Sequence, residues 1–259
     1  MVVSGPAPEG ILIRAYLPEG TGPFPIIVYY HGGGWVIAGL NGYDASCRAL
    51  CNAAGALVLS VDYRMAPENP FPAAMDDAYA ALQWAIGSAA SLDGEPARVA
   101  VVGESAGGNL ATVSCLRARD EGAPLPVHQV LVYPVNNYAF DTPSYAEFEN
   151  AVPLSRPTME WFWGHFLEDE SDGSDPYASS LLADDLSGLP PATVISAQVD
   201  PLASEGLAYA DALEAAGIDG EYQLFEGVTH EFFGTGAVLE EAQQAVALAA
   251  GRLAASFEG

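Results

Sequence analysis

Lysine does not occur in this sequence, and positive charge of any kind is scarce. Eight basic residues stand against 34 acidic ones, which gives a formal net charge of −26 at pH 7. An excess of this size repels nucleic-acid phosphates and anionic lipid, so we expect no nucleic-acid partner and no membrane insertion. Two interpretations of the acidic composition stay open: adaptation to high salt, which screens the self-repulsion, or a bias of composition that leaves a solvated acidic surface.

Cysteine is also rare, and long apolar runs are missing. Cys47 and Cys51 lie four residues apart in one expected helix and Cys115 lies in another, which fits neither a zinc site nor a secreted disulfide framework. We expect three reduced, buried cysteines and no metal site. No run reaches about eighteen apolar residues, and no signal-peptide pattern opens the chain, so a cytoplasmic location is expected.

Strand-like and helical segments alternate along the chain. The expected strands are Ile11–Leu17, Pro25–Tyr30, Ala56–Asp62, Val99–Gly103, Gln129–Tyr133, Thr193–Ala197 and Glu221–Phe225. The expected helices are Tyr43–Ala54, Ala73–Ser88, Gly108–Glu121, Leu202–Ala216 and Val238–Ser256. This alternation predicts an α/β fold: one domain over residues 1–259 with a mostly parallel sheet and helices on both faces.

One stretch breaks the alternation, from Asn136 to Leu189. It is rich in aromatic and acidic residues and reads as an insertion between two strands. We expect a helix over Met159–Leu167 whose aromatic face packs over the carboxyl edge of the sheet. Because active sites of such sheets lie at that edge, the insertion is interpreted as a small cap over the site, with ordinary packing as the alternative.

The pentapeptide from Gly103 to Gly107 has the pattern G-x-S-x-G. It follows the apolar run Val99–Val102 and precedes a helical pattern, so Ser105 is expected at a sharp strand-turn-helix elbow. Flanking glycines suit this turn because its backbone is strained and crowded. The hydroxyl of Ser105 is therefore the candidate nucleophile.

A second glycine-rich motif, His31-Gly32-Gly33-Gly34-Trp35, follows the expected strand Pro25–Tyr30. Three successive glycines contribute nothing to packing. They allow backbone N–H groups to approach an oxyanion, whereas a flexible loop is the alternative interpretation.

A serine nucleophile needs a histidine base and a carboxylate that orients it. In this type of sheet the order along the chain is serine, acid, histidine. His230 follows the last expected strand and is the only histidine after Asp200, so it is the candidate base. We expect His31 to support the glycine loop and the two remaining histidines, His128 and His165, to be structural or at the surface.

The candidate acid is Asp200, which directly follows the expected strand Thr193–Ala197. Its rivals are Asp184, Asp185, Glu205 and Asp219. The first two precede that strand and Asp219 begins the next one, so only Glu205 competes at the carboxyl edge.

Taken together, these motifs resemble the bacterial hormone-sensitive-lipase family of esterases. The resemblance implies the α/β-hydrolase fold, with a mostly parallel sheet of eight strands. The similarity covers nearly the whole chain and includes Tyr30–Trp35, Asp62–Glu68, Phe71–Ala74, Gly103–Gly108, Asp200–Leu202 and His230. It implies hydrolysis of short to medium acyl esters without a cofactor. It also implies that the N–H groups of Gly33, Gly34 and Ala106 form the oxyanion hole, and that Arg64 and Glu68 form an ion pair supporting the site.

The sequence departs from the family pattern at three places. Glu104 stands where Asp or Thr is usual, and Thr229 and Glu231 flank His230 where an apolar residue and Gly are usual. Fewer residues precede His31 than in family members with N-terminal cap helices. Either the cap is reduced to residues 136–189 or the chain is truncated, and a more open site that tolerates bulky esters is the resulting hypothesis.

Other activities stay open on the same scaffold. The machinery also serves amidases, deacetylases and arylformamidases, and a non-catalytic ligand-binding protein of this fold is a further alternative, although such proteins have lost the histidine. The expected partner is a small-molecule ester, and a homodimer stays open.

Overall fold

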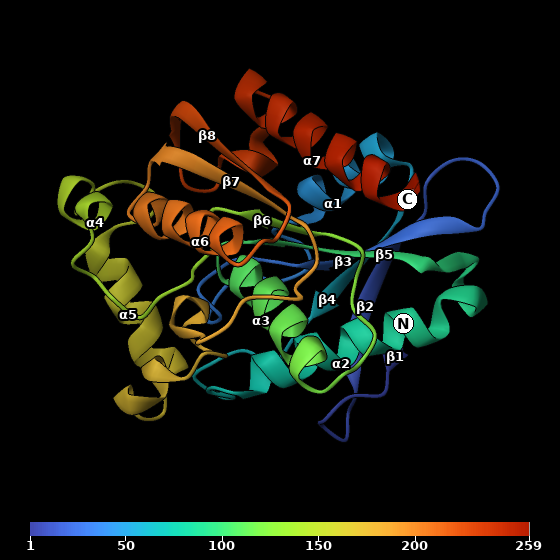
Figure 1. Ribbon diagram of the computed structural model, residues 1–259, viewed down its shortest axis with the longest axis horizontal. Helices are drawn as coiled ribbons and strands as arrows, with labels where there is room; N and C mark the ends of the chain where they lie inside the picture. Colours follow the sequence, from blue (N-terminus) through green and yellow to red (C-terminus); the bar gives the residue numbers. More distant parts are fainter. Residues whose placement is uncertain (259) are drawn as a thin grey trace.

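The fold is built on one sheet of eight strands in the order β1-β2-β4-β3-β5-β6-β7-β8. The computed structural model describes residues 1–258 (Figure 1). The strands are β1 (Val2–Val3), β2 (Ile11–Tyr16), β3 (Phe24–Tyr30), β4 (Leu57–Asp62), β5 (Gly94–Glu104), β6 (Gln129–Val132), β7 (Ala192–Val199) and β8 (Gly220–Thr229). β2 pairs antiparallel with β1 and β4, and the other neighbours pair in parallel. The predicted α/β class and mostly parallel eight-stranded sheet are confirmed.

Helices cover both faces of the sheet (Figure 1). The main ones are α1 (Asp44–Ala54), α2 (Ala73–Ser88), α3 (Ala106–Asp120), α6 (Ala203–Ala215) and α7 (Glu240–Glu258), with short 3-10 turns η1 (Ala89–Leu92) and η4 (Phe232–Thr235). Side chains of a strand alternate between faces. Tyr30 of β3 accordingly packs in the core under α2, α3 and α6, whereas its neighbour Tyr29 packs in the core under α1 and α7.

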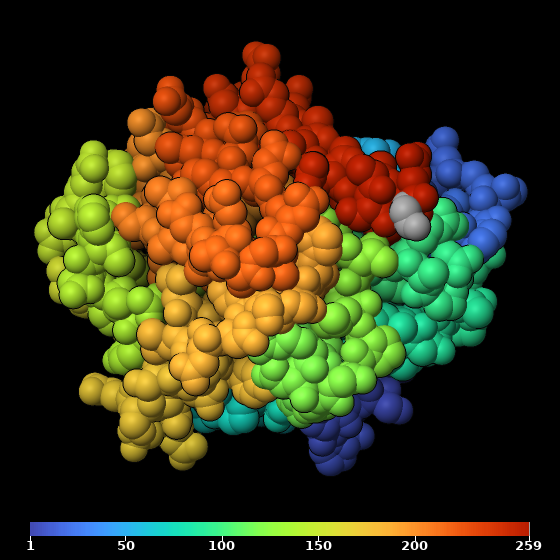
Figure 2. Space-filling model, in the orientation of Figure 1, coloured from blue at the N-terminus to red at the C-terminus, as the bar shows by residue number. Residues whose placement is uncertain are grey.

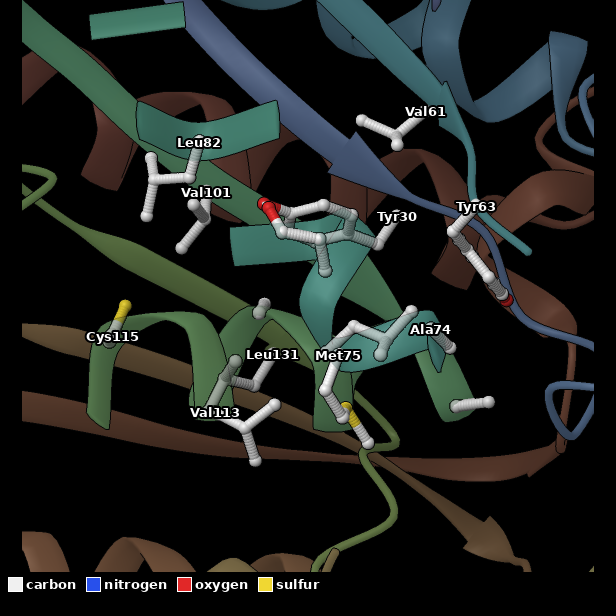
Figure 3. Packing of buried hydrophobic residues seen from close by; sticks show 14 of the residues in the cluster. Tyr30, Val61, Tyr63, Ala74, Met75, Leu82, Val101, Val113, Cys115 and Leu131 are labelled. Carbon is white, nitrogen blue, oxygen red and sulfur yellow. The ribbon is translucent and has the colours of Figure 1, made fainter. Parts of the chain in front are cut away.

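Figure 3 shows the packing of the core between the central strands and helices α2 and α3. Tyr30 lies there with Val101 of β5 and Leu82 of α2, all fully buried. The hydroxyl of Tyr30 donates to the carbonyl of Ala78 at 2.8 Å. Burying one large apolar side chain contributes about 1.5–3 kcal/mol, so the ends of β3 and β5 are held by a rigid core.

The segment between β6 and β7 forms two helices, α4 (Pro143–Glu147) and α5 (Arg156–Phe166), and the 3-10 turns η2 (Glu170–Ser174) and η3 (Ser180–Leu182). The helices lie at one end of the molecule, at the left in Figures 1 and 2. α5 begins three residues before the expected start at Met159, because the hydroxyl of Ser155 caps it by accepting from the N–H of Thr158.

Several strands are longer than the sequence predicts, and β5 and β8 differ most. β5 begins at Gly94, where residues 95–97 are partly or fully exposed and carry no apolar pattern. β8 continues past Phe225 through exposed Glu226 and Gly227, because an irregularity in its pairing with β7 shifts the register. Among residues 1–258, no helix is both long enough and apolar enough to cross a membrane.

Candidate active site

Ser105 lies at the sharp turn between β5 and α3. Its φ of 56° and ψ of −118° are strained for a residue with a Cβ atom. Backbone hydrogen bonds hold the turn: the N–H of Ser105 donates to Val132 at 2.9 Å, and its carbonyl accepts from Asn109 and Val135 at 3.2 Å. The surrounding structure thus fixes the strained serine at the N-terminus of α3.

Glycines beside Ser105 allow neighbouring backbone to come close. A Cβ at Gly103 would lie 2.0 Å from the carbonyl oxygen of Gly107, and a Cβ at Gly107 would lie 2.0 Å from that of Tyr30. A side chain fits at neither place, which gives the glycine spacing of the motif a steric cause.

Ser105, His230 and Asp200 form a hydrogen-bonded series of side chains. The Nε2 atom of His230 lies 3.0 Å from Oγ of Ser105, and its Nδ1 atom lies 2.7 Å from Oδ2 of Asp200. The other oxygen of Asp200 accepts from the N–H of Leu202 at 2.9 Å. Because β5, β7 and β8 run in the same direction, their carboxyl ends bring these three sequence-predicted residues to one edge of the sheet.

Several acidic groups act on His230. Burial lowers the pKa of the imidazole, but the charge and hydrogen bond of Asp200 and the charges of Glu231 and Glu104 outweigh burial, so the pKa is raised above 6.5. An imidazole in this setting accepts a proton readily and is stabilised as a cation by Asp200.

The other histidines are placed away from this series. The buried ring of His31 has Nδ1 2.7 Å from the carbonyl oxygen of Gly32, within the glycine loop. His128 is buried with Nε2 2.9 Å from the hydroxyl of Thr193, and His165 is half-buried on α5. These positions fit the structural and surface roles expected for them.

The rival acids also lie elsewhere. Asp184, Asp185 and Asp219 are exposed and precede β7 or β8, at the opposite ends of those strands. Glu205 is buried on α6, where burial and the charge of Asp200 raise the pKa of its carboxyl well above the usual range. Among the described residues, Asp200 is the carboxylate bonded to Nδ1 of His230.

The glycine loop after β3 lies beside Ser105. Gly33 and Gly34 have φ values of 102° and 58°, in the left-handed region that favours glycine. A Cβ on Gly34 would lie 2.2 Å from the ring of Phe162 in α5. Within residues 1–258, the N–H groups of both glycines have no hydrogen-bond partner, and the N–H of Ala106, as the first residue of α3, has none within its helix. These are the three predicted oxyanion donors.

Helix α5 packs directly on the glycine loop. The ring of Trp35 stacks on Phe166 with centroids 4.1 Å apart and contacts Trp163 at 4.7 Å. All three side chains are buried. The aromatic face of the inserted helix therefore supports the loop that carries Gly33 and Gly34.

A cavity of about 320 Å³ opens at Ser105. It is lined by Gly33, Gly34, Ile37, Ala38, Gly42, Tyr43, Ser105, Pro153, Leu154, Thr158, Phe162, His230 and Glu231. Four of these come from the insertion, and much of the lining is apolar. No feature of the sequence indicates that Tyr43 lines this cavity, and Glu231 stands out in the sequence only as a departure from the family pattern. The position of Glu231 directly after His230 was the available signal.

Glu104 is buried between two tyrosines. The hydroxyls of Tyr29 and Tyr133 both donate to its carboxylate. Burial and the charge of Glu231 raise the pKa of Glu104 to about 7, although the two hydrogen bonds act in the opposite direction. Glu104, next to Ser105, thus binds a tyrosine of β3 and the tyrosine that directly follows β6.

The prediction that Arg64 forms an ion pair with Glu68 is wrong. Arg64 instead binds Asp77 of α2 through Nε and Nη2, at 2.9 Å each, and its backbone N–H donates to the same carboxylate at 2.9 Å. Asp77 is buried, whereas Glu68 is exposed. A buried carboxylate with matching geometry competes better for the guanidinium than a solvated one.

No group of His, Cys, Asp or Glu side chains within residues 1–258 is arranged to hold a metal ion. The three cysteines are buried and unpaired, as their spacing predicts.

Comparison with known proteins agrees with this geometry. A family model described as the alpha/beta hydrolase fold matches residues 27–234. The carboxylic ester hydrolase LipN of Mycobacterium tuberculosis is 47% identical over 236 residues, which cover 89% of this chain and 62% of LipN. The carboxylesterase NlhH of that species is 40% identical over 239 residues, 91% of this chain and 75% of NlhH. This chain thus spans less than two thirds of the length of LipN.

Solved structures extend the likeness to three dimensions. The hyperthermophilic esterase of the archaeon Pyrobaculum calidifontis matches with a TM-score of 0.95 and 40% identity, over 98% of this chain and 84% of that one. The chain therefore belongs to the family with the α/β-hydrolase fold, within its group of esterases similar to hormone-sensitive lipase.

Proposed function

We propose that the protein is a serine esterase that hydrolyses small carboxylic esters. In this proposal Ser105 is the nucleophile, His230 the general base and Asp200 the residue that orients and stabilises His230. The observation that carries the proposal is the unbroken series from Oγ of Ser105 through both ring nitrogens of His230 to Asp200, at 3.0 and 2.7 Å. A nucleophile, a base and an orienting carboxylate in this order activate a serine hydroxyl.

The proposed cycle has two halves. His230 takes the proton of Ser105 at Nε2 while Oγ attacks the ester carbonyl, and the developing oxyanion faces the N–H groups of Gly33, Gly34 and Ala106. The protonated His230 then gives its proton to the leaving alcohol, which leaves an acyl-enzyme. Water attacks this intermediate with His230 again as base, the acid is released, and no cofactor takes part.

Short to medium acyl groups are the proposed substrates. A cavity of about 320 Å³ with Leu154 and Phe162 in its wall supports this range. Both residues belong to the segment 136–189, which we infer acts as the cap of the single α/β domain. Three unpaired, buried cysteines support a cytoplasmic location as part of the proposal.

A series of p-nitrophenyl esters, from acetate to palmitate, tests this function. The wild type should show its highest kcat/KM for the short and medium members and little turnover of matched p-nitroanilides. Ser105→Ala should lose at least about 10³-fold in kcat. Ser91→Ala, which changes an exposed serine of η1, should retain full activity. Full turnover by Ser105→Ala, or faster cleavage of the amides, contradicts the proposal.

A further inference from the structure

Glu231 places a carboxylate at the mouth of the proposed active site. It follows His230 directly and adopts a left-handed conformation, with φ of 68° and ψ of 11°. This conformation is disfavoured for a residue other than glycine. The turn nevertheless carries a long acidic side chain, and that side chain lines the same cavity as Ser105.

Two contacts fix the direction of this carboxylate. The hydroxyl of Tyr43 donates to Oε1 of Glu231 at 2.8 Å. The same oxygen lies 3.7 Å from Nε2 of His230, which is the nitrogen that faces Ser105. The side chain of Glu231 is 40% exposed and that of His230 only 4%, so the carboxylate is open to an incoming molecule.

The charge of Glu231 has no permanent counter-charge in the cavity, because His230 is a cation only when it is protonated. Among the described residues that line it, Glu231 is the one acidic side chain, and arginine is absent. A carboxylate in a largely apolar cavity attracts a cation there more strongly than it would in open water. The excess of negative charge over the whole chain acts in the same direction.

The position of Glu231 also determines which part of a bound ester lies next to its carboxylate. In the proposed cycle, Nε2 of His230 delivers a proton to the oxygen of the leaving alcohol. Because Oε1 of Glu231 lies 3.7 Å from that nitrogen, the alcohol part of the ester passes next to the carboxylate. The acyl carbonyl oxygen faces the glycine loop instead.

We propose that Glu231, oriented by Tyr43, is a specificity-determining residue that favours esters of amino alcohols, whose alcohol part carries an ammonium group. This inference rests on the proposed esterase function and names the class of alcohol that the site prefers. It assigns a purpose to a carboxylate that the serine, histidine and aspartate do not need for chemistry.

A pair of esters of equal shape tests the inference. Choline butyrate carries a quaternary ammonium group, and 3,3-dimethylbutyl butyrate has a neutral carbon in its place. The ratio of their kcat/KM values, measured by acid release, is compared between the wild type and Glu231→Gln, so that differences in intrinsic ester reactivity cancel. Glutamine keeps the length of the side chain and an oxygen for Tyr43. The matched control is Glu226→Gln, which removes an equal charge from an exposed position on β8 outside the cavity.

The ratio should fall about tenfold in Glu231→Gln and stay within about twofold of the wild type in Glu226→Gln, and the difference should shrink in 0.5 M salt. An unchanged ratio in Glu231→Gln, or an equal fall in both variants, overturns the inference. Turnover of the neutral ester separates the two proposals. If that turnover depends on Ser105 while the ratio does not depend on Glu231, the esterase function stands and only the charge preference fails; if neither ester is cleaved, both fail.

Discussion

The ring of Tyr133 lies against the imidazole of His230, with the ring centroids 4.5 Å apart. Its hydroxyl donates to the buried carboxylate of Glu104. The proposed base therefore has Asp200 at one nitrogen and Glu231 near the other, and Glu104 is bound to the hydroxyl of the tyrosine that lies against its ring. The pH dependence of activity follows from this arrangement.

We expect kcat/KM for a neutral ester to rise with pH as His230 loses its proton. Burial lowers the pKa of His230, but Asp200, Glu231 and Glu104 together raise this pKa by more than burial lowers it. The midpoint of the rise in kcat/KM should therefore lie above pH 6.5. Glu231→Gln removes one of the raising charges and should move the midpoint to lower pH. Rate profiles from pH 5 to 9 measure both. A midpoint that stays in place or moves upward in Glu231→Gln contradicts this electrostatic account.

Glu104 should make the protein less stable as the solution becomes more alkaline. The pKa of its carboxyl is raised from 4.5 to about 7 in the folded protein, so the folded state holds the proton more tightly than the unfolded state does. Its contribution to stability is fully present below pH 4.5 and is lost as pH rises through about 7.

Between pH 5 and pH 8, the unfolding free energy of the wild type should therefore fall by about 2–3 kcal/mol because of Glu104. Glu104→Gln should not show this part of the fall. Urea unfolding at both pH values measures this difference. Glu226→Gln, at an exposed position, is the control and should track the wild type. Equal pH dependence in Glu104→Gln and the wild type counts against a proton on Glu104.

Gly34→Ala should damage catalysis more than stability alone explains. The new methyl group would lie 2.2 Å from the ring of Phe162, so the glycine loop and its N–H donors must shift. A displaced donor costs about 10²–10³ in kcat. Gly55 has the same φ of 58° but no atom within 4 Å of its Cβ position, which makes Gly55→Ala the matched control. That variant should lose about 1–2 kcal/mol of stability and keep its kcat; equal kcat in the two variants contradicts the prediction.

Arg64→Met should destabilise the fold by about 1.5–3 kcal/mol, because it removes the charged hydrogen bonds to the buried carboxylate of Asp77 and leaves only the backbone N–H of residue 64 as a donor. The double variant Arg64→Met with Asp77→Leu should recover most of this loss, since it removes both charges. Denaturant unfolding of the three proteins gives the comparison. A double variant as unstable as Arg64→Met alone shows that the pair does not act as a unit.

The sequence predicts those parts of the fold that local pattern encodes. β3, β4 and the apolar half of β5 are dense in Val, Ile and Leu, and Ser105, Asp200 and His230 each directly follow a strand. Their order along the chain and the common direction of parallel strands predict that these three residues meet at one edge of the sheet. Short elements such as β1 and α4, with two and five residues, are too brief to show a period.

Contacts between segments that are distant along the chain cannot be predicted from local sequence pattern. Tyr43 and Glu231 are 188 residues apart, and no local feature of either indicates the other. The sequence pairs Arg64 with Glu68, four residues away, whereas Arg64 reaches Asp77 only because α2 packs beside the loop that carries Arg64. The cavity wall cannot be predicted locally for the same reason. Phe162 belongs to the insertion, and tertiary packing alone brings its ring next to Gly34.

The most direct test of the central claim is to trap the acyl group. Rapid mixing with p-nitrophenyl butyrate should release a burst of p-nitrophenol equal to the enzyme concentration, and acid quenching followed by peptide mass spectrometry should find one butyryl group on Ser105. His230→Ala should abolish the burst. A butyryl group on another residue, or steady turnover with no acyl-enzyme and undiminished in Ser105→Ala, would contradict the account.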